Sequence, residues 1–344
     1  MHLRPKTTIR ASALTAVLAL SLAACGGGDA DEPAAAGDTG GSAADAGDDG
    51  AAEEGAAGGL SGDIAIDGSS TVTPLTEPAA ELFMQENPDV RVAVGTSGTG
   101  GGFEKFCNGE TDISMASREI KQEEIDACAE AGITYEELGV ANDGIALVVN
   151  PANDWASCLT VDELSSAWQD GSTVQSWSDI NPDFPDEPIE LYGPGTDSGT
   201  FDYFTEAING EEGNIRQDYN DIGEDDNAAV IGVSGTTGAL AFIPLTYATE
   251  AGDQVRTIEV ENEAGDCVAP SEETVQAGDY NPLGRQLFIY PKGASIADKP
   301  EVKAFAEFYV NNSGEIAEAA GFIPLTEEQK QTALDQIASL GGGR

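Results

Sequence analysis

The chain has 344 residues and carries 62 Asp and Glu against 15 Lys and Arg, a formal net charge of −47 at pH 7. So acidic a chain repels nucleic acid, and none is expected as a partner. The one histidine is His2, which excludes Ser-His-Asp and Cys-His catalysis and histidine metal sites from the rest of the chain. No enzyme, cofactor or metal site is therefore expected. The acidity is interpreted as a solvation adaptation, because the loop pattern of calcium-binding motifs is absent.

The N-terminus has the features of an export signal. Basic residues precede an apolar run at 11–24, which ends in LSLAAC, so residues 1–24 are predicted to be a signal peptide. Cys25, after small residues and before three glycines, is predicted to be lipidated; the alternative is an ordinary cleaved signal with a chance cysteine. The predicted location is the outer face of the cytoplasmic membrane.

The segment 25–59 is predicted to be a disordered acidic tether. It consists almost entirely of Ala, Gly, Asp and Glu, and cannot bury enough apolar surface to fold. The folded body begins near Leu60 and is long enough for two lobes.

The body alternates strand and helix patterns, which predicts an α/β fold with mostly parallel sheets. A capping box, Thr326-x-x-Gln329, precedes the last helix. Predicted strands lie at 63–66, 90–94, 112–117, 144–150, 189–193 and 285–291, and predicted helices at 75–83, 103–107, 162–171, 201–208, 302–309 and 327–340.

Three of the predicted turns join a buried strand to a helix N-terminus and are rich in hydroxyl groups. Free N–H groups and the helix dipole at such a start favour an anion. Three such turns together predict a site for a tetrahedral oxyanion, although any one of them alone is more often structural. The hydroxyl residues are Ser69, Ser70 and Thr71; Thr96, Ser97 and Thr99; and Ser198 and Thr200.

Four cysteines follow Cys25, and an even number in an exported chain indicates two disulfides. Three connectivities are open. The pairing Cys107–Cys128 with Cys158–Cys267 is favoured.

Four stretches resemble, in sequence and in order, the phosphate-binding proteins of bacterial ABC phosphate transporters (the PstS family), and among them the cyanobacterial-type branch. They are DGSSTVTPL, GTSGTGGGFEKFCNGETDISMASR, YGPGTDSGTFDYF and PLGRQLFIYP. The resemblance implies a two-lobed type II periplasmic-binding-protein (Venus-flytrap) fold with two chain crossovers, near Asn150 and Leu283. Lobe I would comprise 60–150 and 283–344, and lobe II 151–282.

The resemblance also implies which residues bind phosphate. In the first turn these are Thr71, through its hydroxyl, Val72, through its backbone N–H, and the neighbouring Ser70. Ser97 matches in the second turn, and Ser198, Gly199 and Thr200 match in the third.

One departure affects the charges of the site. The best-known branch has Asp where this chain has Arg118, and Arg where it has Pro194. A buried dianion needs a positive charge, and Arg118 is predicted to supply it and to bind phosphate. The alternative for Arg118 is a surface ion pair with Glu119 or Glu123. Arg216 and Arg285 are the next candidates for the cation.

Because the usual proton acceptor is replaced, another acid must accept the proton that phosphate keeps at neutral pH. Asp143 and Asp226 are the candidates, although Asp226 is as well explained as a helix cap.

The expected function is that of a monomeric receptor that binds inorganic phosphate and hands it to an ABC permease. The alternatives are a receptor for sulfate, molybdate or tungstate, and a secreted phosphatase, for which no histidine is present to activate a serine.

Overall fold

The computed structural model describes residues 59–341. The predicted signal, the predicted lipidation site Cys25 and all but the last residue of the predicted tether lie outside this range. Within it, no helix combines the length and apolar character needed to cross a bilayer.

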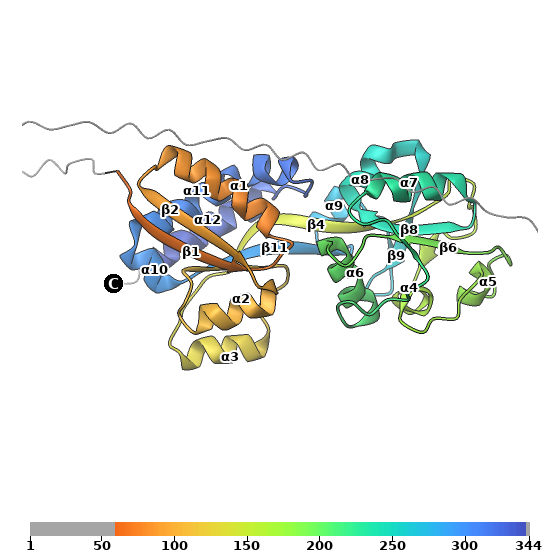
Figure 1. Ribbon diagram of the computed structural model, residues 1–344, viewed down its shortest axis with the longest axis horizontal. Helices are drawn as coiled ribbons and strands as arrows, with labels where there is room; N and C mark the ends of the chain where they lie inside the picture. Colours follow the sequence, from red (N-terminus) through yellow and green to blue (C-terminus); the bar gives the residue numbers. More distant parts are fainter. Residues whose placement is uncertain (1–58, 342–344) are drawn as a thin grey trace, which may run out of the picture. The chain divides into compact units, whose positions relative to one another are not determined.

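Two long strands, β4 (Leu138–Val149) and β11 (Gly284–Pro291), run side by side through the middle of the fold (Figure 1). They pair with each other in antiparallel orientation. The hydrogen-bonded strand order is β2-β1-β3-β11-β4-β8-β6-β7, so β11 and β4 join two groups of strands. The chain thus passes twice between two lobes.

The first lobe contains the elements at both ends of the described chain. Its strands and helices enclose a core that includes Ile64, Phe83, Ile113 and Phe305. Its elements are β1 (Gly62–Gly68), α1 (Thr73–Glu86), β2 (Val90–Thr96), α2 (Gly98–Cys107), β3 (Ile113–Ala116), α3 (Gln122–Glu130), α10 (Gly293–Asp298), α11 (Pro300–Ala319) and α12 (Glu327–Gly341).

The second lobe has a separate core, which includes Leu147, Trp168, Phe204 and Phe242. Its elements are β5 (Cys158–Leu159), α4 (Val161–Trp168), α5 (Trp177–Ile180), β6 (Glu190–Gly193), α6 (Gly199–Asn209), β7 (Asn220–Asp221), α7 (Asp226–Gly235), β8 (Ala239–Pro244), α8 (Leu245–Ala251), the 3₁₀ turn η1 (Gly252–Gln254), β9 (Arg256–Glu261), β10 (Cys267–Val268) and α9 (Glu272–Gln276).

The expectation of mostly parallel sheets is wrong at the centre of the molecule. Within the lobes, β1 pairs in parallel with β2 and β3, and β6 with β7 and β8. The two crossing strands, however, pair antiparallel with each other and with β3 and β8. The chain leaves the first lobe along one of these strands and returns along the other. Because the two strands are neighbours, they must run in opposite directions.

The glycine-rich stretch after β2 is helical from Gly98, whereas the sequence predicts this helix only at 103–107. Glycine is unfavourable in a helix, but here the packing of the helix against β1 requires glycine. A Cβ on Gly102 would lie 2.5 Å from the Cα of Gly68, so α2 can approach β1 only without a side chain there.

Two local predictions agree with the structure. The disulfides are Cys107–Cys128, which joins α2 to α3, and Cys158–Cys267, which joins β5 to β10. In the capping box, the Gln329 N–H donates to the Thr326 hydroxyl at 3.1 Å, and the Thr326 N–H donates to the Gln329 side chain at 2.9 Å.

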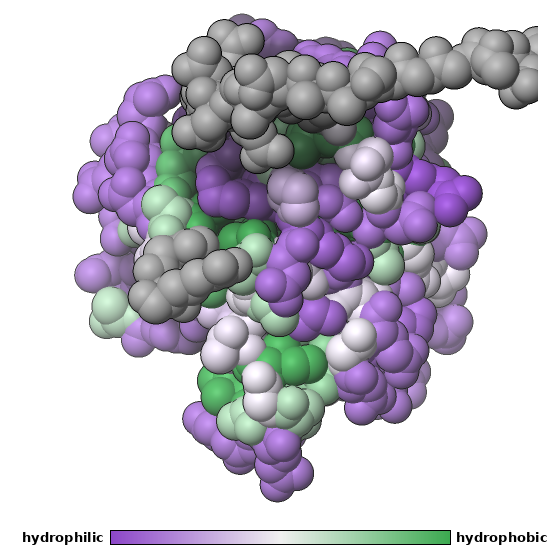
Figure 2. Space-filling model, turned by 90° about the vertical axis from the view of Figure 1, so that its left-hand side faces the viewer, coloured by the Kyte–Doolittle hydropathy of each residue, from purple (hydrophilic) through white to green (hydrophobic). Residues whose placement is uncertain are grey.

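The surface of the first lobe is strongly polar. Figure 2 looks onto the end of the molecule that lies on the left in Figure 1, and hydrophilic side chains cover most of the visible face around smaller apolar areas. Among the described residues, the large hydrophobic side chains with substantial exposure are Leu82, Ile231 and Tyr247. This pattern fits the acidity of the chain.

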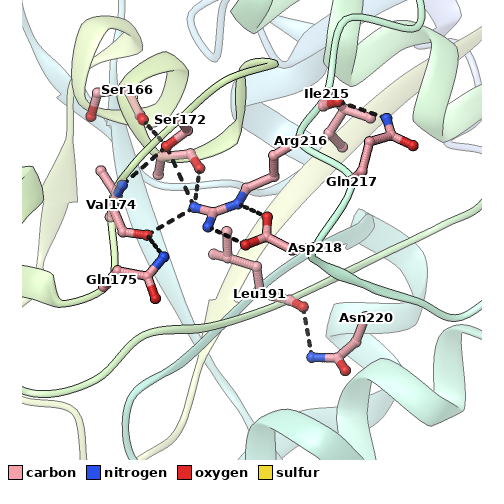
Figure 3. A network of polar contacts seen from close by, with 11 residues as sticks. Ser166, Ser172, Val174, Gln175, Leu191, Ile215, Arg216, Gln217, Asp218 and Asn220 are labelled. Carbon is pink, nitrogen blue, oxygen red and sulfur yellow. Dashed lines mark hydrogen bonds and ion pairs between the residues drawn. The ribbon is translucent and has the colours of Figure 1, made fainter.

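A buried arginine, Arg216, forms hydrogen bonds to several segments of the second lobe (Figure 3). Arg216 donates to the backbone carbonyls of Ala167 and Val174, both at 3.0 Å, and to both carboxylate oxygens of Asp218, at 2.6 and 2.9 Å. Its side chain is 6% exposed. All its strong contacts are structural, so Arg216 is not available as an anion ligand.

Replacing this arginine should therefore destabilise the protein. Arg216→Ala removes the hydrogen bonds to the carbonyls of Ala167 and Val174, the second of which keeps only the bond from the Gln175 side chain, and this should lower the free energy of unfolding by about 2–3 kcal/mol. Arg91→Ala removes an ion pair whose side chains are 79% and 72% exposed, and should cost less than about 1 kcal/mol. Urea denaturation of both variants tests this; equal losses would contradict it.

Candidate functional site

The turns at the ends of β1 and β2 open onto a cavity of about 350 Å³. The segment after β3, the crossing strand β11 and the second lobe complete its wall. Its lining residues are Ser69, Ser70, Thr71, Ser97, Gly98, Thr99, Gly100, Ser117, Arg118, Lys121, Asp202, Tyr203, Glu206, Glu212 and Arg285. A neighbouring cavity of about 610 Å³ shares Arg118 and Arg285 but contains none of the turns, so the smaller cavity is the candidate site.

Ser69 and Thr99, from the predicted hydroxyl-rich turns, and Arg285, a further candidate cation, line this cavity. So do four of the residues predicted to bind phosphate: Ser70, Thr71, Ser97 and Arg118. Three of them belong to the turns that precede α1 and α2. Val72 lies just behind them, fully buried as the N-cap residue of α1.

The third predicted turn lies directly behind the first. A Cβ on Gly199, the first residue of α6, would lie 2.8 Å from the Thr71 hydroxyl oxygen, so the two turns are in close contact. Ser198 is buried and caps α6 by accepting a hydrogen bond from the Thr200 N–H. None of Ser198, Gly199 and Thr200 is among the cavity-lining residues.

Arg285 connects the parts of the site. It donates to both Asp143, at 3.1 Å, and the Ser117 carbonyl, at 3.2 Å, and it makes a long contact of 3.5 Å with the Thr71 hydroxyl. Its guanidinium lies 3.6 Å from the centre of the Tyr203 ring. Arg285 therefore touches both crossing strands, the first turn and the second lobe. Sequence reasoning ranked it only as a reserve candidate.

Arg118 is partnered within the protein. It makes two hydrogen bonds, of 2.9 and 2.8 Å, to the carboxylate of Glu124 and a third, of 3.0 Å, to the backbone carbonyl of Glu119. The predicted ion pair with the side chain of Glu119 or Glu123 is wrong, because Glu124 is the partner. The hydrogen bonds to Glu124 raise the pKa of Arg118 above its already high value. Lys121, which the sequence did not mark, lies on the same wall of the cavity.

The two candidate proton acceptors lie outside the cavity lining. Asp143 pairs with Arg285 across β4 and β11. Asp226 begins α7, and burial raises its pKa to about 6, with help from Glu224 and Asp225.

Three acids that the sequence did not mark line the second-lobe wall: Asp202, Glu206 and Glu212. Burial, together with the neighbouring Glu212, raises the pKa of Asp202 to about 6. Arg118, Lys121 and Arg285 are the cations of the cavity, so the site holds three acids and three bases. The chain from residue 60 onward holds 53 acids and 12 bases, so the cavity is far less acidic than the body around it.

The site has no arrangement typical of a metal centre. Among the described residues, one group of potential metal ligands lies close together, namely Cys158, Glu259 and Cys267. These two cysteines form a disulfide and offer no thiolate.

Comparison with known proteins supports the same fold. Residues 36–313 match the family described as the PBP superfamily domain. SphX of Synechocystis is 44% identical over 77% of this chain and 79% of its own length. The phosphate-binding protein PstS of Staphylococcus saprophyticus is 36% identical over 80% and 85%.

Solved structures agree. The crystal structure of a possible phosphate binding protein from Planctomyces limnophilus is 41% identical, with a TM-score of 0.78, and the match covers 82% of this chain and 99% of that one. An ABC-type phosphate transport receptor from Vibrio cholerae, 22% identical over 76% of this chain and 99% of its own, has the same fold at a TM-score of 0.62.

The fold and the matched region define a member of the PBP superfamily with the two-lobed type II architecture. Within it, the chain belongs to the family of SphX and the PstS proteins.

The raised pKa of Asp202 predicts how stability depends on pH. Because its pKa in the folded protein exceeds the ordinary value of 3.8, the ionised form is disfavoured, and this residue lowers stability as pH rises through about 6. Asp202→Asn should therefore raise the free energy of unfolding relative to wild type at pH 7.5 but not at pH 3.5.

Asp112 provides a control of opposite sign. Burial raises its pKa, but hydrogen bonds from Lys299 and Ser295 outweigh that effect and leave the pKa below its ordinary value. Asp112→Asn should destabilise at pH 7.5, and the loss should shrink as pH falls. Denaturant unfolding at both pH values measures each difference; the same sign for both variants at pH 7.5 would contradict the assignment.

Proposed function

We propose that the protein is an extracytoplasmic receptor that binds inorganic phosphate between its lobes and delivers it to an ABC-type permease. The observation that carries this is the cavity, where the hydroxyl-rich turns before α1 and α2 face three of the 12 cations of the body. The names of its relatives, phosphate-binding proteins among them, support the choice of ligand.

Each part of the cavity has a role in this proposal. The Thr71 and Ser97 hydroxyls, with Ser70 and the Val72 N–H, contact phosphate oxygens at the two first-lobe turns. Arg285 or Arg118 supplies the positive charge, since hydroxyls and dipoles alone compensate a buried dianion poorly. Arginine suits this role because its planar fork can bind two phosphate oxygens at once.

The third turn supplies hydrogen-bond donors from the second lobe. Its contact with Thr71 brings the N-terminus of α6 to the first turn. We propose that Ser198, Gly199 and Thr200 donate to the same phosphate. The donors are then held on both lobes, as a ligand that binds between them requires.

The other candidates are less well supported. Sulfate, molybdate or tungstate has a similar shape, and the cavity size does not separate them. Hydrolysis of phosphate esters needs an activated nucleophile, and the only histidine is His2. We propose a receptor without catalytic activity.

The organisation of the chain follows from this role. We propose that residues 1–24 are removed on export, that Cys25 carries the lipid anchor and that the rest of 25–59 is a flexible tether. The first lobe would comprise 60–150 and 283–344, and the second 151–282. Two separate cores support a division into two lobes, although the second core also includes residues 145–149, Leu283 and Ile323, at and beyond these boundaries.

Calorimetric titration of the ligand-free protein tests the ligand and the cations together. Wild type should bind phosphate more tightly than sulfate or molybdate. Arg285→Ala and Arg118→Ala should each weaken phosphate binding by more than about 30-fold, since each removes a charged hydrogen-bond donor.

Arg91→Ala, which removes an exposed arginine outside the cavity, is the matched control and should leave the affinity unchanged. Lys121 is unsuitable as a control because it lines the cavity. Arg285→Ala or Arg118→Ala with the affinity of Arg91→Ala would remove that arginine from the site, and a wild type that prefers sulfate or molybdate would overturn the proposed ligand.

The anchor is tested separately. Cys25→Ser should release the protein into the medium or leave its signal uncleaved, because only the cysteine thiol can receive the lipid. Mass spectrometry of the membrane-bound protein should find a lipid on an N-terminal Cys25. An unmodified N-terminus at another residue would disprove the anchor and leave the ligand proposal intact.

A further inference from the structure

Asp67, near the end of β1, holds the second turn of the site in place. One of its carboxylate oxygens accepts two hydrogen bonds from Ser97, from the backbone N–H at 3.1 Å and from the hydroxyl. The other oxygen accepts from the Lys105 ammonium at 2.6 Å. Ser97 is the N-cap residue of α2, yet its side chain does not cap the helix, because the hydroxyl is used by Asp67.

The contacts keep this carboxylate ionised and in place. Burial raises the pKa of Asp67, but the hydrogen bonds from Lys105 and Ser97 outweigh that effect and leave the pKa below its ordinary value. A Cβ on Gly95 would lie 2.3 Å from the carboxylate, so the absence of a side chain there makes room for it. An ionised carboxylate can only accept hydrogen bonds, and therefore the Ser97 hydroxyl must donate to it.

This donation determines what Ser97 can offer to a ligand. A serine hydroxyl has one proton and two lone pairs. With its proton committed to Asp67, Ser97 presents only lone pairs to the cavity that it lines. Thr71 has the opposite polarity, because it accepts the long contact from Arg285 and keeps its own proton free to donate.

A site with one fixed acceptor distinguishes between oxyanions by their protons. At neutral pH phosphate retains a proton and sulfate does not. Hydrogen phosphate can donate to a lone pair, whereas sulfate places an oxygen against it and leaves both unpaired. Neither Asp143 nor Asp226, the acids expected to fill this role, lines the cavity.

We propose that Ser97 is a specificity-determining residue that accepts the phosphate proton, and that Asp67 is the positioning residue that fixes its hydroxyl in the accepting orientation. The inference rests on the proposed function and deepens it, because it assigns selectivity for a protonated oxyanion to a neutral side chain.

Asp67→Ala is the decisive variant. It removes the acceptor of both hydrogen bonds from Ser97, so the Ser97 hydroxyl can turn its proton into the cavity. Lys105, whose side chain is 40% exposed, stays in contact with solvent. Phosphate should lose its acceptor and sulfate should gain a donor, so the ratio of phosphate to sulfate affinity should fall by at least about 10-fold.

Two further variants separate this role from a merely structural one. Ser97→Ala removes the lone pairs and should weaken phosphate binding about 10-fold while leaving sulfate binding unchanged. Lys105→Gln removes the cation but keeps the hydrogen bond from Ser97 to Asp67, and it should keep the selectivity ratio within about threefold of wild type. Asp202→Asn, on the opposite wall of the cavity, tests the competing assignment in which a second-lobe acid accepts the phosphate proton.

Calorimetric titration with inorganic phosphate and with sulfate at pH 7.5 measures all five proteins. An unchanged ratio in Ser97→Ala overturns the inference, even where Asp67→Ala does not fold. A ratio that collapses in Asp202→Asn and not in Ser97→Ala assigns the proton acceptor to the second lobe and also overturns it. A wild type that binds no phosphate refutes the proposed function itself, whereas wild-type phosphate binding with unchanged variants refutes only this inference.

Discussion

The ion pair between Arg285 and Asp143 joins the two strands on which both lobes depend. The residues face each other across β11 and β4, and their side chains are 12% and 13% exposed. A pair this deeply placed gains from a lowered dielectric but loses hydration, so its further hydrogen bonds decide whether it is favourable. Arg285 has them, to the Ser117 carbonyl and the Thr71 hydroxyl, and it stacks on Tyr203. The strand crossing, the first turn and the second lobe are therefore tied to one guanidinium.

This arrangement explains how a strongly acidic protein can present an anion site. Exposed charges beyond about 10 Å are screened at moderate salt, so the potential inside the cavity depends mainly on the groups that line it. There, three cations face three acids, and helix N-termini add positive potential. The second-lobe acids repel an anion and the first-lobe cations attract it. The cavity is thus balanced, and the direction of individual hydrogen bonds decides which anion fits.

Sequence reasoning succeeded where the signal was local. The hydroxyls of Thr71 and Ser97 follow strands whose pattern is visible in a few residues, and the capping box of Thr326 spans one helical turn. Strong local chemistry of this kind survives tertiary packing. For the disulfides, counting cysteines predicts that there are two but leaves three connectivities open.

Sequence reasoning failed where the role of a residue depends on a partner that is distant in the sequence. Arg285 and Asp143 are separated by 142 residues, and only the pairing of β4 with β11 brings them together. Gly102 resembles a turn residue until β1 is packed against it. Ser97 was identified as a hydroxyl in the site, but its polarity is set by Asp67, which lies on β1, 30 residues away in the sequence.

The two lobes therefore contribute different things to the site. The polarity of Ser97 and of Thr71 is set by Asp67, on β1, and by Arg285, on β11, so neither depends on a second-lobe side chain. The second lobe adds the α6 N-terminus, the Tyr203 ring and an acidic wall. An anion that does not engage the first-lobe cations would meet mainly repulsion from that wall. The polarity of the site is thus set in the first lobe, and the second lobe favours confinement only of an anion that the first-lobe cations already engage.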